Sequence, residues 1–370
     1  MSLRVLIVPD KFKGTLTARQ AAEALARGWR KNRPQDKLEL LPMTDGGDGF
    51  GEIIGSLLHA KVQTVATVDS AHRSCRAQWW WEPRSKTAVI ESAGVIGLAG
   101  LPPKKFHPFE LDTHGLGAVL RAAVKKGAAR CLIGIGGSAT NDAGFGVARA
   151  LGWIFLDRHG HQLTRWTQLD SLATLRPPRR TRWFTKLIVA VDVQNPLLGP
   201  RGCSRVYGPQ KGLAPEDFPH AEACLRRLAT VLKRQRHRDN SRQRGAGAAG
   251  GLGFGLAGFL GAQLQRGFEL FAQMAKLNQH LRRADLVITG EGTMDPSTFM
   301  GKGVGEIARR CLKMKIPCIG LAGQITVPHW VGLFTTMRCL TELTPLEKAR
   351  QKPAYWLERL AARVAKDWPA

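Results

Sequence analysis

The sequence lacks the features that would place the chain in a membrane, an oxidising compartment or a zinc site. No stretch approaches the ~20 uninterrupted apolar residues that a membrane-spanning helix needs. The beginning of the chain lacks the long apolar region and cleavage pattern of a secretory signal. The seven cysteines are odd in number, dispersed and without a CxxC pair, which favours buried free thiols over disulfides or zinc ligands. We therefore expect a soluble, cytoplasmic protein with no membrane partner.

Acidic residues are scarce, with 29 Asp and Glu against 55 Lys and Arg and a formal net charge of +26. Such an excess indicates nucleic acid, an acidic membrane surface or anionic substrates as partners. The densest basic run, residues 226–244, contains eight Lys and Arg against Asp239 alone. Its first half has the pattern of an amphipathic helix and its second half that of a solvated loop. Because no zinc finger, RNP-type aromatic motif or basic zipper is present, we expect no nucleic-acid partner.

At 370 residues the chain suits two domains. Alternating strand and helix patterns at its two ends indicate a parallel sheet with helices on both faces. Five strands are expected there, in the flavodoxin-like order 2-1-3-4-5. The predicted fold class is α/β, with a discontinuous flavodoxin-like domain of residues 1–60 plus 283–370 and an inserted mixed-sheet α/β domain of residues 61–282. The expected outer strands are 4–9, 37–41, 285–289, 317–321 and 336–340, and the expected inner strands are 63–68, 77–81, 87–91, 130–135 and 186–191.

The 41 glycines are clustered in loops that also carry charged or hydroxyl side chains. Glycine is placed where a backbone turns sharply or approaches a ligand closely, and open α/β sheets bind ligands beyond the carboxyl ends of their strands. The segment GEGTMDPSTFMGKG at 290–303 is also expected to be a loop. Five loops therefore become candidates for the site: PDKFKG at 9–14, DGGDG at 45–49, GIGGSATND at 134–142, VDVQNPLLG at 191–199 followed by YGPQKG at 207–212, and the segment 290–303.

The loop at 134–142 is the most informative, because it follows a buried strand, precedes a helix and offers small residues with two hydroxyls. Such a loop is a plausible cradle for nucleotide phosphates, although it is neither a Walker A loop nor a GxGxxG motif. Asn141 or Asp142 also suits a helix N-cap, which is compatible with a ligand site. The expected nucleotide-binding residues are Gly136, Gly137, Ser138, Thr140 and Asn141.

Carboxylates and lysines complete the chemistry that phosphoryl transfer requires. Glu291 and Asp295 offer oxygen ligands to Mg²⁺, and Lys302 offers a cation for developing charge. DGGDG suits Mg²⁺ or polyol hydroxyls and equally suits a plain Asp-Gly turn. Asp192 stands at the end of a strand, where Asn195 and Lys211 can converge with it.

These segments, in this order, resemble the bacterial glycerate kinase family (the type 1 group). The resemblance covers nearly the whole chain and rests on PDKFKGTLTA, LPMTDGGDG, IGIGGSATNDAGFG, AVDVQNPLLGPRG, YGPQKG, GAGAAGGLGF and VITGEGTMD. It implies ATP-dependent phosphorylation of D-glycerate, commonly to 2-phosphoglycerate, on two α/β domains with the site in their cleft. The implied cofactors are ATP and Mg²⁺, and a homodimer is left open.

The chain departs from the family's pattern at six positions. A single charged donor beside the phosphates can matter by ~10² or more in rate, so the lost Arg at position 293 bears on activity and acceptor choice. The departures are Lys11 for Ser, Asp48 for Glu, Thr293 for Arg, Ser297 for Gln, Val304 for Pro and Glu306 for Gly.

The expected reaction is an in-line transfer to a glycerate hydroxyl, with Asp192 as the base or as the group that orients the acceptor. Asp295 and Asp45 remain alternatives for the base. Two other functions stay open: a weakened paralogue that senses a nucleotide or sugar acid, and a kinase for another small hydroxy acid. The expected roles are catalytic for Asp192, Lys302 and Lys211; acceptor-binding for Asp10, Lys13, Asp45 and Asn195; and metal-binding for Asp295 and Glu291.

Overall fold

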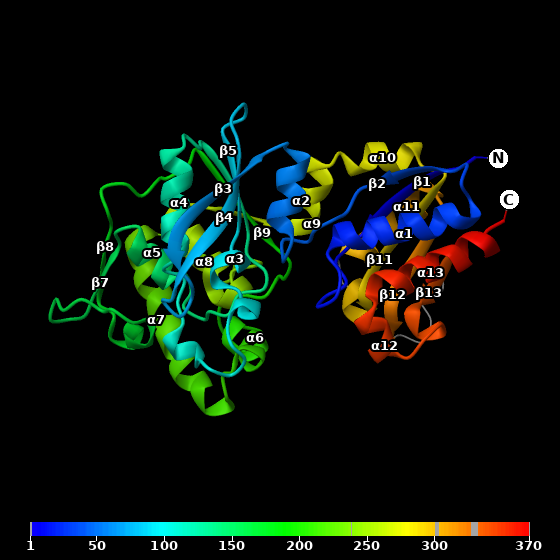
Figure 1. Cartoon of the computed structure of the whole chain (residues 1–370). Coiled ribbons are helices and arrows are strands. Elements are labelled where there is room, and N and C mark those ends of the chain that lie inside the picture. The colour runs from blue at the N-terminus through cyan, green and yellow to red at the C-terminus, as the bar shows by residue number, and fades with distance from the viewer. Residues whose placement is uncertain (1, 238, 300–302, 327–331, 370) are drawn as a thin grey trace. The chain divides into compact units, whose positions relative to one another are not determined.

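The computed structural model describes residues 2–237, 239–299, 303–326 and 332–369. The chain forms two compact units, one made of residues 1–45 with 268–370 and the other of residues 46–267 (Figure 1). The predicted fold class, a discontinuous flavodoxin-like part and an inserted mixed-sheet part, is confirmed. In the described part, no helix combines the length and apolar character needed to cross a membrane. All seven cysteines are free thiols, and five of them are buried.

Unit one contains a five-stranded sheet in the order β13-β12-β11-β1-β2, in which every neighbouring pair is parallel. This is the predicted order 2-1-3-4-5. The strands are β1 (Arg4–Pro9), β2 (Lys37–Leu40), β11 (Leu286–Met294), β12 (Cys318–Ile325) and β13 (Thr336–Cys339). The helices are α1 (Ala18–Asn32), α9 (Gly267–Met274), α10 (Leu277–Arg283), α11 (Gly303–Met314), α12 (Leu346–Gln351) and α13 (Pro353–Asp367), with short 3₁₀ helices η5 (Pro296–Phe299) and η6 (Leu340–Glu342).

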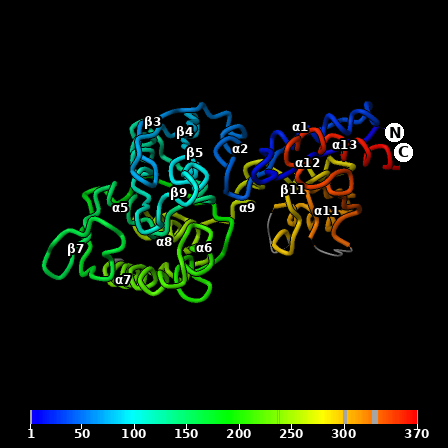
Figure 2. The backbone as a smooth tube through the Cα atoms, turned by 60° about the horizontal axis from the view of Figure 1, so that its bottom comes forward, coloured from blue at the N-terminus to red at the C-terminus, as the bar shows by residue number. Residues whose placement is uncertain are grey.

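The apolar run of β1 explains the layering of this unit. Val5 and Ile7 lie in a core cluster with residues of α1 and α13, and Leu6 and Val8, which alternate with them, are equally buried. A strand buried on both faces belongs in the centre of a covered parallel sheet. Helices α1 and α13 lie side by side (Figures 1 and 2). They approach closely at Gly28, where a Cβ atom would overlap the backbone carbonyl of Glu358.

Strand β11 is longer than predicted. Residues 290–294, which we expected to be loop, continue the strand, because Glu291, Thr293 and Met294 pair with β12. The glycines of this segment permit the close strand contacts: a Cβ at Gly290 would overlap the carbonyl oxygen of Leu321. The expectation of a loop over the whole of residues 290–303 was therefore wrong for residues 290–294.

Unit two contains a six-stranded mixed sheet in the order β10-β9-β6-β5-β4-β3. Strands β3, β4 and β5 pair antiparallel, whereas β5, β6, β9 and β10 pair parallel. Strand β10 and the small β7–β8 hairpin were not predicted. The strands are β3 (Lys61–Val68), β4 (Ser74–Glu82), β5 (Thr87–Glu91), β6 (Arg130–Gly134), β7 (Ile154–Leu156), β8 (Thr174–Arg176), β9 (Lys186–Val191) and β10 (Gln263–Arg266).

Helices and 3₁₀ turns cover this sheet and connect its strands (Figure 1). They bury a large cluster of aliphatic and aromatic side chains that includes Phe145, Phe155 and Phe259. The helices are α2 (Phe50–Leu57), α3 (Ala93–Ile96), α4 (Leu116–Lys125), α5 (Phe145–Ala150), α6 (Cys203–Lys211), α7 (Phe218–Arg236) and α8 (Ala248–Leu260), and the 3₁₀ turns are η1 (Leu98–Gly100), η2 (Pro108–Glu110), η3 (Trp166–Ser171) and η4 (Pro215–Asp217).

Both unit boundaries lie earlier in the chain than the predicted 60/61 and 282/283. Helix α2 joins unit two because Gly51 and Gly55 lie directly against the Trp80 ring, where a Cβ would clash. Helix α9 joins unit one because Glu269 forms an ion pair with Arg310 at 2.9 Å. Neither contact could be read from local sequence, since each joins segments far apart in the chain.

The glycine-rich segment at 245–261 forms a helix with an irregular start. Ala249, Gly250 and Gly251 have positive φ values, so α8 is not regular there. A Cβ on Gly250 would overlap the carbonyl oxygen of Thr140, and Ala143 N–H donates to the Gly250 carbonyl at 3.0 Å. The glycines therefore let the backbone of α8 lie directly on the turn at 140–144.

We expect Gly250→Ala to lower the free energy of unfolding by about 3 kcal/mol or more, because a methyl group there meets backbone rather than a movable side chain. The matched control is Gly261→Ala, which has a similar positive φ but open space around it. It should cost about 1 kcal/mol. Urea unfolding of both variants measures the difference, and equal costs would contradict the steric explanation.

Candidate active site

The predicted site residues divide between the two units, and each unit holds a coherent group. Unit one contains the metal candidates and three of the four acceptor-binding candidates, and unit two contains the phosphate-loop candidates together with Asp192 and Asn195. Lys302 lies outside the described residues. Unit one thus holds Asp10, Lys13, Asp45, Glu291 and Asp295, and unit two holds Gly136, Gly137, Ser138, Thr140, Asn141, Asp192, Asn195 and Lys211.

Carboxylates gather around Asp10, which directly follows β1 and is buried. Burial raises the pKa of Asp10, and the charges of Asp45 and Glu291 raise it further, to about 8. Lys11 acts in the opposite direction, because its ammonium lies 3.6 Å from Asp45 and its N–H donates to the Asp10 carboxyl at 2.7 Å. Asp10 therefore holds a proton at neutral pH and can donate a hydrogen bond.

The turn that follows β11 fixes the two metal candidates. The Thr298 hydroxyl donates to Glu291 Oε1 at 2.8 Å and accepts from the Asp295 N–H at 3.1 Å. Ser297 N–H donates to Asp295 Oδ1 at 2.7 Å. One threonine hydroxyl thus links the segments that carry both carboxylates.

The donor chemistry of Glu291 and Asp295 fits Mg²⁺, which prefers oxygen ligands. In the described part of the chain, no three His, Cys, Asp or Glu side chains form a ready-made metal cluster. Mg²⁺ is often bound through one or two carboxylates plus substrate phosphates rather than by an all-protein cage. A pair of carboxylates therefore suffices for an ion that arrives with a nucleotide.

Lys13 is exposed, and its backbone passes close to β11. A Cβ on Gly292 would lie 3.1 Å from the Lys13 nitrogen. The glycine thus lets the 10–13 segment lie against the strand that carries Glu291. The predicted acceptor-binding lysine and the predicted metal ligand come from neighbouring backbone segments within unit one.

In unit two, the loop at 134–142 packs against the second half of the DGGDG motif. Gly136 N–H donates to the Gly46 carbonyl at 3.1 Å. A Cβ on Gly137 would lie 2.6 Å from Asp48 Oδ1. Glu91 completes this region, because its two carboxylate oxygens accept N–H groups of Gly49 and Gly51 at the start of α2. The unit boundary thus falls inside DGGDG, with Asp45 in unit one and the rest in unit two.

The backbone of the 134–142 loop has the features of an anion cradle. Gly137 has a φ of +77°. The N–H groups of Gly137 and Ser138 donate to no other group within the described residues. Adjacent N–H donors at a turn between a strand and a helix form a concave site for phosphate oxygens.

The side chains of this loop are turned into the protein. The Ser138 and Thr140 hydroxyls lie 2.9 Å apart, and both residues are buried. Asn141 Nδ2 donates to Ser204 on α6 at 2.9 Å, whereas Asn141 Oδ1 is buried with no partner among the described groups. These side chains therefore hold the loop in shape and leave the backbone to face a ligand.

Asp142 supports the start of α5. Its Oδ2 accepts from the Thr113 N–H and hydroxyl and from the Gly146 N–H, at 2.8 to 2.9 Å. Burial raises the pKa of Asp142 to about 6, with a smaller contribution from Asp112. The N-cap position itself is Gly144. The expectation that Asn141 or Asp142 occupies that position was wrong, although the Asp142 side chain does satisfy a donor there.

Lys211 is buried beneath the same loop. Its ammonium donates to the Thr140 carbonyl at 2.7 Å. Burial lowers the pKa of Lys211 to about 8, although the charges of Cys203 and Asp142 oppose that shift. The lysine thus places a positive charge directly under the predicted phosphate cradle.

Asp192 and Asn195 lie near a tyrosine that sequence reasoning missed. The Tyr207 hydroxyl donates to Asn195 Oδ1 at 2.7 Å, and Asn195 Nδ2 donates to the Arg201 carbonyl at 2.8 Å. Burial raises the pKa of Tyr207 to about 12, and the charge of Asp192 contributes. Asp192 is exposed at the end of β9, where it can reach a ligand.

The missed residues Tyr207 and Ser204 had a usable signal in the sequence. Positions 204, 207 and 211 are spaced so that they share one face of helix α6. Lys211 was a candidate already, so its two partners on that face were the natural next choice. Glu91 had no such signal, because its role depends on contacts with a segment 40 residues away.

Comparisons with known proteins agree on one family. A family model described as "Glycerate kinase family" matches residues 5–369. "Glycerate kinase" of Bacillus subtilis (strain 168) is 34% identical over 98% of this chain and 97% of its own length. "Glycerate 2-kinase" of Escherichia coli (strain K12) is 35% identical over 94% of this chain and 93% of its own length. A crystal structure from Salmonella typhimurium LT2, described as a candidate glycerate kinase 2, is similar with a TM-score of 0.83 and 33% identity, over 99% of this chain and 98% of that one.

We expect the raised pKa of Asp10 to appear as a pH-dependent stability. Between about pH 4 and pH 8 the folded chain holds a proton on Asp10 that the unfolded chain has released, so stability falls as pH rises. Relative to Asp10→Asn, the wild type should lose up to about 1.4 kcal/mol per pH unit in this window. Urea unfolding across the pH range measures this difference.

Asp45→Asn is the matched control for that experiment. It removes the neighbouring charge that raises the Asp10 pKa most, so the decline in stability should end at a lower pH. A difference between wild type and Asp10→Asn that stays flat from pH 4 to pH 8 would contradict the raised pKa.

Proposed function

The chain belongs to the glycerate kinase family, and from that premise we propose that it transfers the γ-phosphoryl group of ATP to the 2-hydroxyl group of D-glycerate. The family makes the chain a kinase. The 2-hydroxyl is supported by the relative named "Glycerate 2-kinase", which is 35% identical over most of both chains. The observation that carries the proposal is the 134–142 loop, with the adjacent N–H donors of Gly137 and Ser138 and a buried ammonium that contacts the Thr140 carbonyl.

The nucleotide phosphates are assigned to that loop. Gly137 and Ser138 provide backbone donors, and Lys211 provides a positive charge that contacts the Thr140 carbonyl. Preorganised donors of this kind stabilise phosphoryl charge without rearranging during the reaction. Because Lys211 contacts the loop itself, its role in the proposal is to hold the cradle and its charge in place. Lys302 keeps the role of a second cation from the predicted last loop.

The acceptor is assigned to Asp10, Lys13, Asp45 and Asn195. A protonated Asp10 can donate to an acceptor oxygen, and an exposed Lys13 can pair with a carboxylate. Asn195 is oriented by its bonds to Tyr207 and Arg201. Each of these groups suits a hydroxyl or carboxylate group of a small molecule.

Asp192 is the proposed base, or the group that orients the acceptor hydroxyl. It is exposed at the end of a buried strand, where an acceptor can reach it. Glu291 and Asp295 would hold Mg²⁺, which supplies charge neutralisation at the nucleotide phosphates when it is bound. Asp45 and Asp295 remain the other carboxylates to test as the base.

We expect the purified chain to release ADP when ATP, Mg²⁺ and D-glycerate are all supplied, and to form 2-phosphoglycerate as the product. A coupled ADP assay measures turnover, and ³¹P NMR distinguishes the 2-phosphate from the 3-phosphate. Nucleotide binding without turnover would instead support the sensor function. Faster turnover with another small hydroxy acid in an acceptor panel would change the assigned substrate.

We expect Asp192→Asn to lower kcat by about 10²-fold or more, because the amide cannot accept the hydroxyl proton. The KM for ATP should change little, since the phosphate cradle is untouched. The matched control is Asp170→Asn, which alters another exposed aspartate of unit two that has no proposed role. If Asp192→Asn keeps near-normal turnover, the base must be sought at Asp45 or Asp295.

A further inference from the structure

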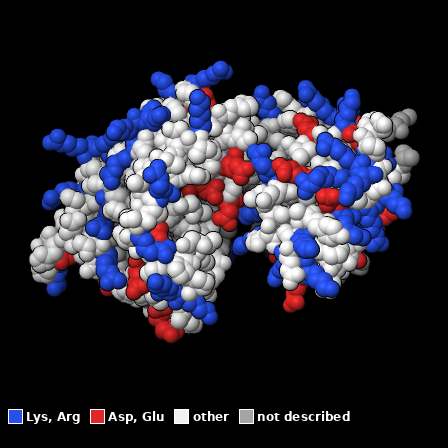
Figure 3. All heavy atoms as spheres, in the orientation of Figure 1, with Lys and Arg blue, Asp and Glu red and all other residues white. Residues whose placement is uncertain are grey.

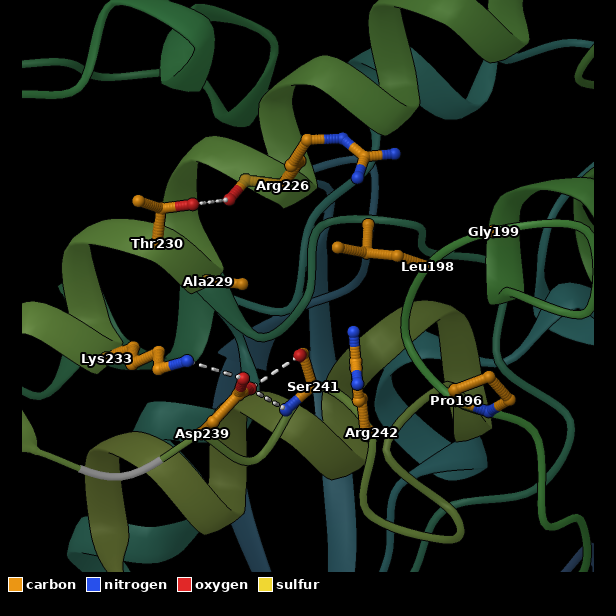
Figure 4. Close-up of a pocket in the computed structure, with 10 residues that line it drawn as sticks. All are labelled: Pro196, Leu198, Gly199, Arg226, Ala229, Thr230, Lys233, Asp239, Ser241 and Arg242. Carbon is orange, nitrogen blue, oxygen red and sulfur yellow. Dashed lines mark hydrogen bonds and ion pairs between the residues drawn. The ribbon is translucent and has the colours of Figure 1, made fainter.

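The basic run at residues 226–244 contributes to a pocket in unit two that the proposed reaction does not use. The cavity has a volume of about 470 Å³, within the range of small-molecule sites. Figure 4 shows its walls, which come from α7, the segment 239–242 and the loop that follows Asn195. We call it the basic pocket, lined by Pro196, Leu198, Gly199, Arg226, Ala229, Thr230, Lys233, Asp239, Ser241 and Arg242.

Helical periodicity explains why α7 can face both the core and this pocket. Positions 226, 229, 230 and 233 follow the i, i+3, i+4, i+7 spacing of a single helix face, and all four line the pocket. The alternate positions Leu225, Leu228, Val231 and Leu232 are buried in the core. The helix thus presents a cationic stripe to the pocket and an apolar stripe to the core of unit two.

The cations of the run have different partners. Arg227 and Arg234 are already engaged, because they donate to the carbonyls of Leu172 and Ala173. Arg242, in contrast, makes no ion pair or hydrogen bond through its side chain with any described residue. Figure 4 shows Arg226 and Arg242 on different sides of the pocket.

The charge balance of the lining favours an anion. Arg226, Lys233 and Arg242 oppose a single lining carboxylate, Asp239. Asp239 lies 3.3 Å from the Lys233 ammonium and accepts the Ser241 N–H at 3.0 Å. Glu222, outside the lining, lies 3.6 Å from Arg226 and also accepts the Gly199 N–H. Positive charge therefore remains after these contacts, mainly at Arg242.

The pocket differs from the general basic surface. Lys and Arg spread over both units on the face shown in Figure 3, and such a spread selects no ligand by itself. The basic pocket adds concavity and apolar walls at Leu198 and Ala229. Cations beside an apolar wall suit a ligand that has both an anionic group and an organic body.

We propose that the basic pocket binds a small phosphate monoester, with the phosphate between Arg226 and Arg242 and the organic body against Leu198 and Ala229. A phosphate monoester carries about −1.5 to −2 charges at neutral pH, and Arg226, Lys233 and Arg242 supply charge of the opposite sign. The planar guanidinium group is well suited to phosphate oxygens. The site does not depend on the proposed reaction.

The bound ligand would also stabilise the loop that carries Asn195. Leu197 N–H donates to the Ser241 carbonyl at 2.8 Å, and Gly247 N–H donates to the Asn195 carbonyl at 2.9 Å. These bonds connect the pocket wall to the acceptor-binding segment. Occupancy of the pocket therefore provides a route by which a phosphorylated metabolite changes turnover.

Isothermal titration calorimetry of the full chain tests the site, with AMP, glycerol 3-phosphate and inorganic phosphate as probes. Arg226→Gln and Arg242→Gln should each weaken binding of the organic phosphates by about tenfold or more, because each removes a charge-assisted contact. The matched control is Arg244→Gln, which removes an arginine of the same run that does not line the pocket. Melting temperatures of all three variants verify folding.

The probes also distinguish two classes of phosphate monoester, nucleoside phosphates and smaller phosphorylated metabolites. Tighter binding of AMP identifies a nucleoside phosphate, and comparable binding of glycerol 3-phosphate identifies a phosphorylated metabolite. Either result supports the site if Arg226→Gln and Arg242→Gln both weaken binding of the probe and Arg244→Gln does not. Binding that survives both variants belongs elsewhere and overturns the proposal, as does the absence of binding at millimolar probe concentrations. Kinase activity without probe is measured separately. A failure of the proposed pocket is therefore distinguishable from a failure of the proposed kinase reaction.

Discussion

The geometry of unit two depends on one close contact between backbones: the glycine-rich start of α8 lies on the turn at 140–144. Side chains at Gly250 or Gly255 would overlap the carbonyl oxygens of Thr140 and Ala143. The same Thr140 carbonyl accepts the Lys211 ammonium from the α6 side. The proposed phosphate cradle therefore lies between two helices: α8 has no side chains at the contact, and α6 contributes a buried ammonium.

Burial shifts the pKa of one ionisable group in each unit: upward for the Asp10 carboxyl group in unit one and downward for the Lys211 ammonium group in unit two. In unit one, Asp10 lies near the negative charges of Asp45 and Glu291, and its raised pKa keeps it protonated at neutral pH. In unit two, a buried lysine responds to burial with a pKa lowered to about 8. Each response reduces the cost of burying an ion. The result places acidic groups where an acceptor and a metal ion are expected, and cationic groups where phosphates are expected.

Local patterns predicted the strands well and the tertiary contacts poorly. Strands β1, β5 and β9 have the predicted bounds, because each is a short apolar run between clear turn signals. The sheet order of unit one followed from alternation of strands and helices. The unit boundaries depended instead on Trp80 against α2 and on the ion pair between Glu269 and Arg310. Periodicity carries no information about such distant partners.

Thr293 stands where the family usually has Arg, and this exchange changes the charge of the segment rather than its fold. Thr293 pairs with Gln324 within the parallel ladder between β11 and β12, and the Gln324 amide donates to its hydroxyl at 3.3 Å. A β-branched threonine suits a strand at least as well as an arginine does, so the exchange leaves the strand intact. What it removes is one positive charge from a segment that also carries Glu291 and Asp295. Under the proposed reaction, Mg²⁺ would therefore be the positive charge beside Glu291 and Asp295 within unit one.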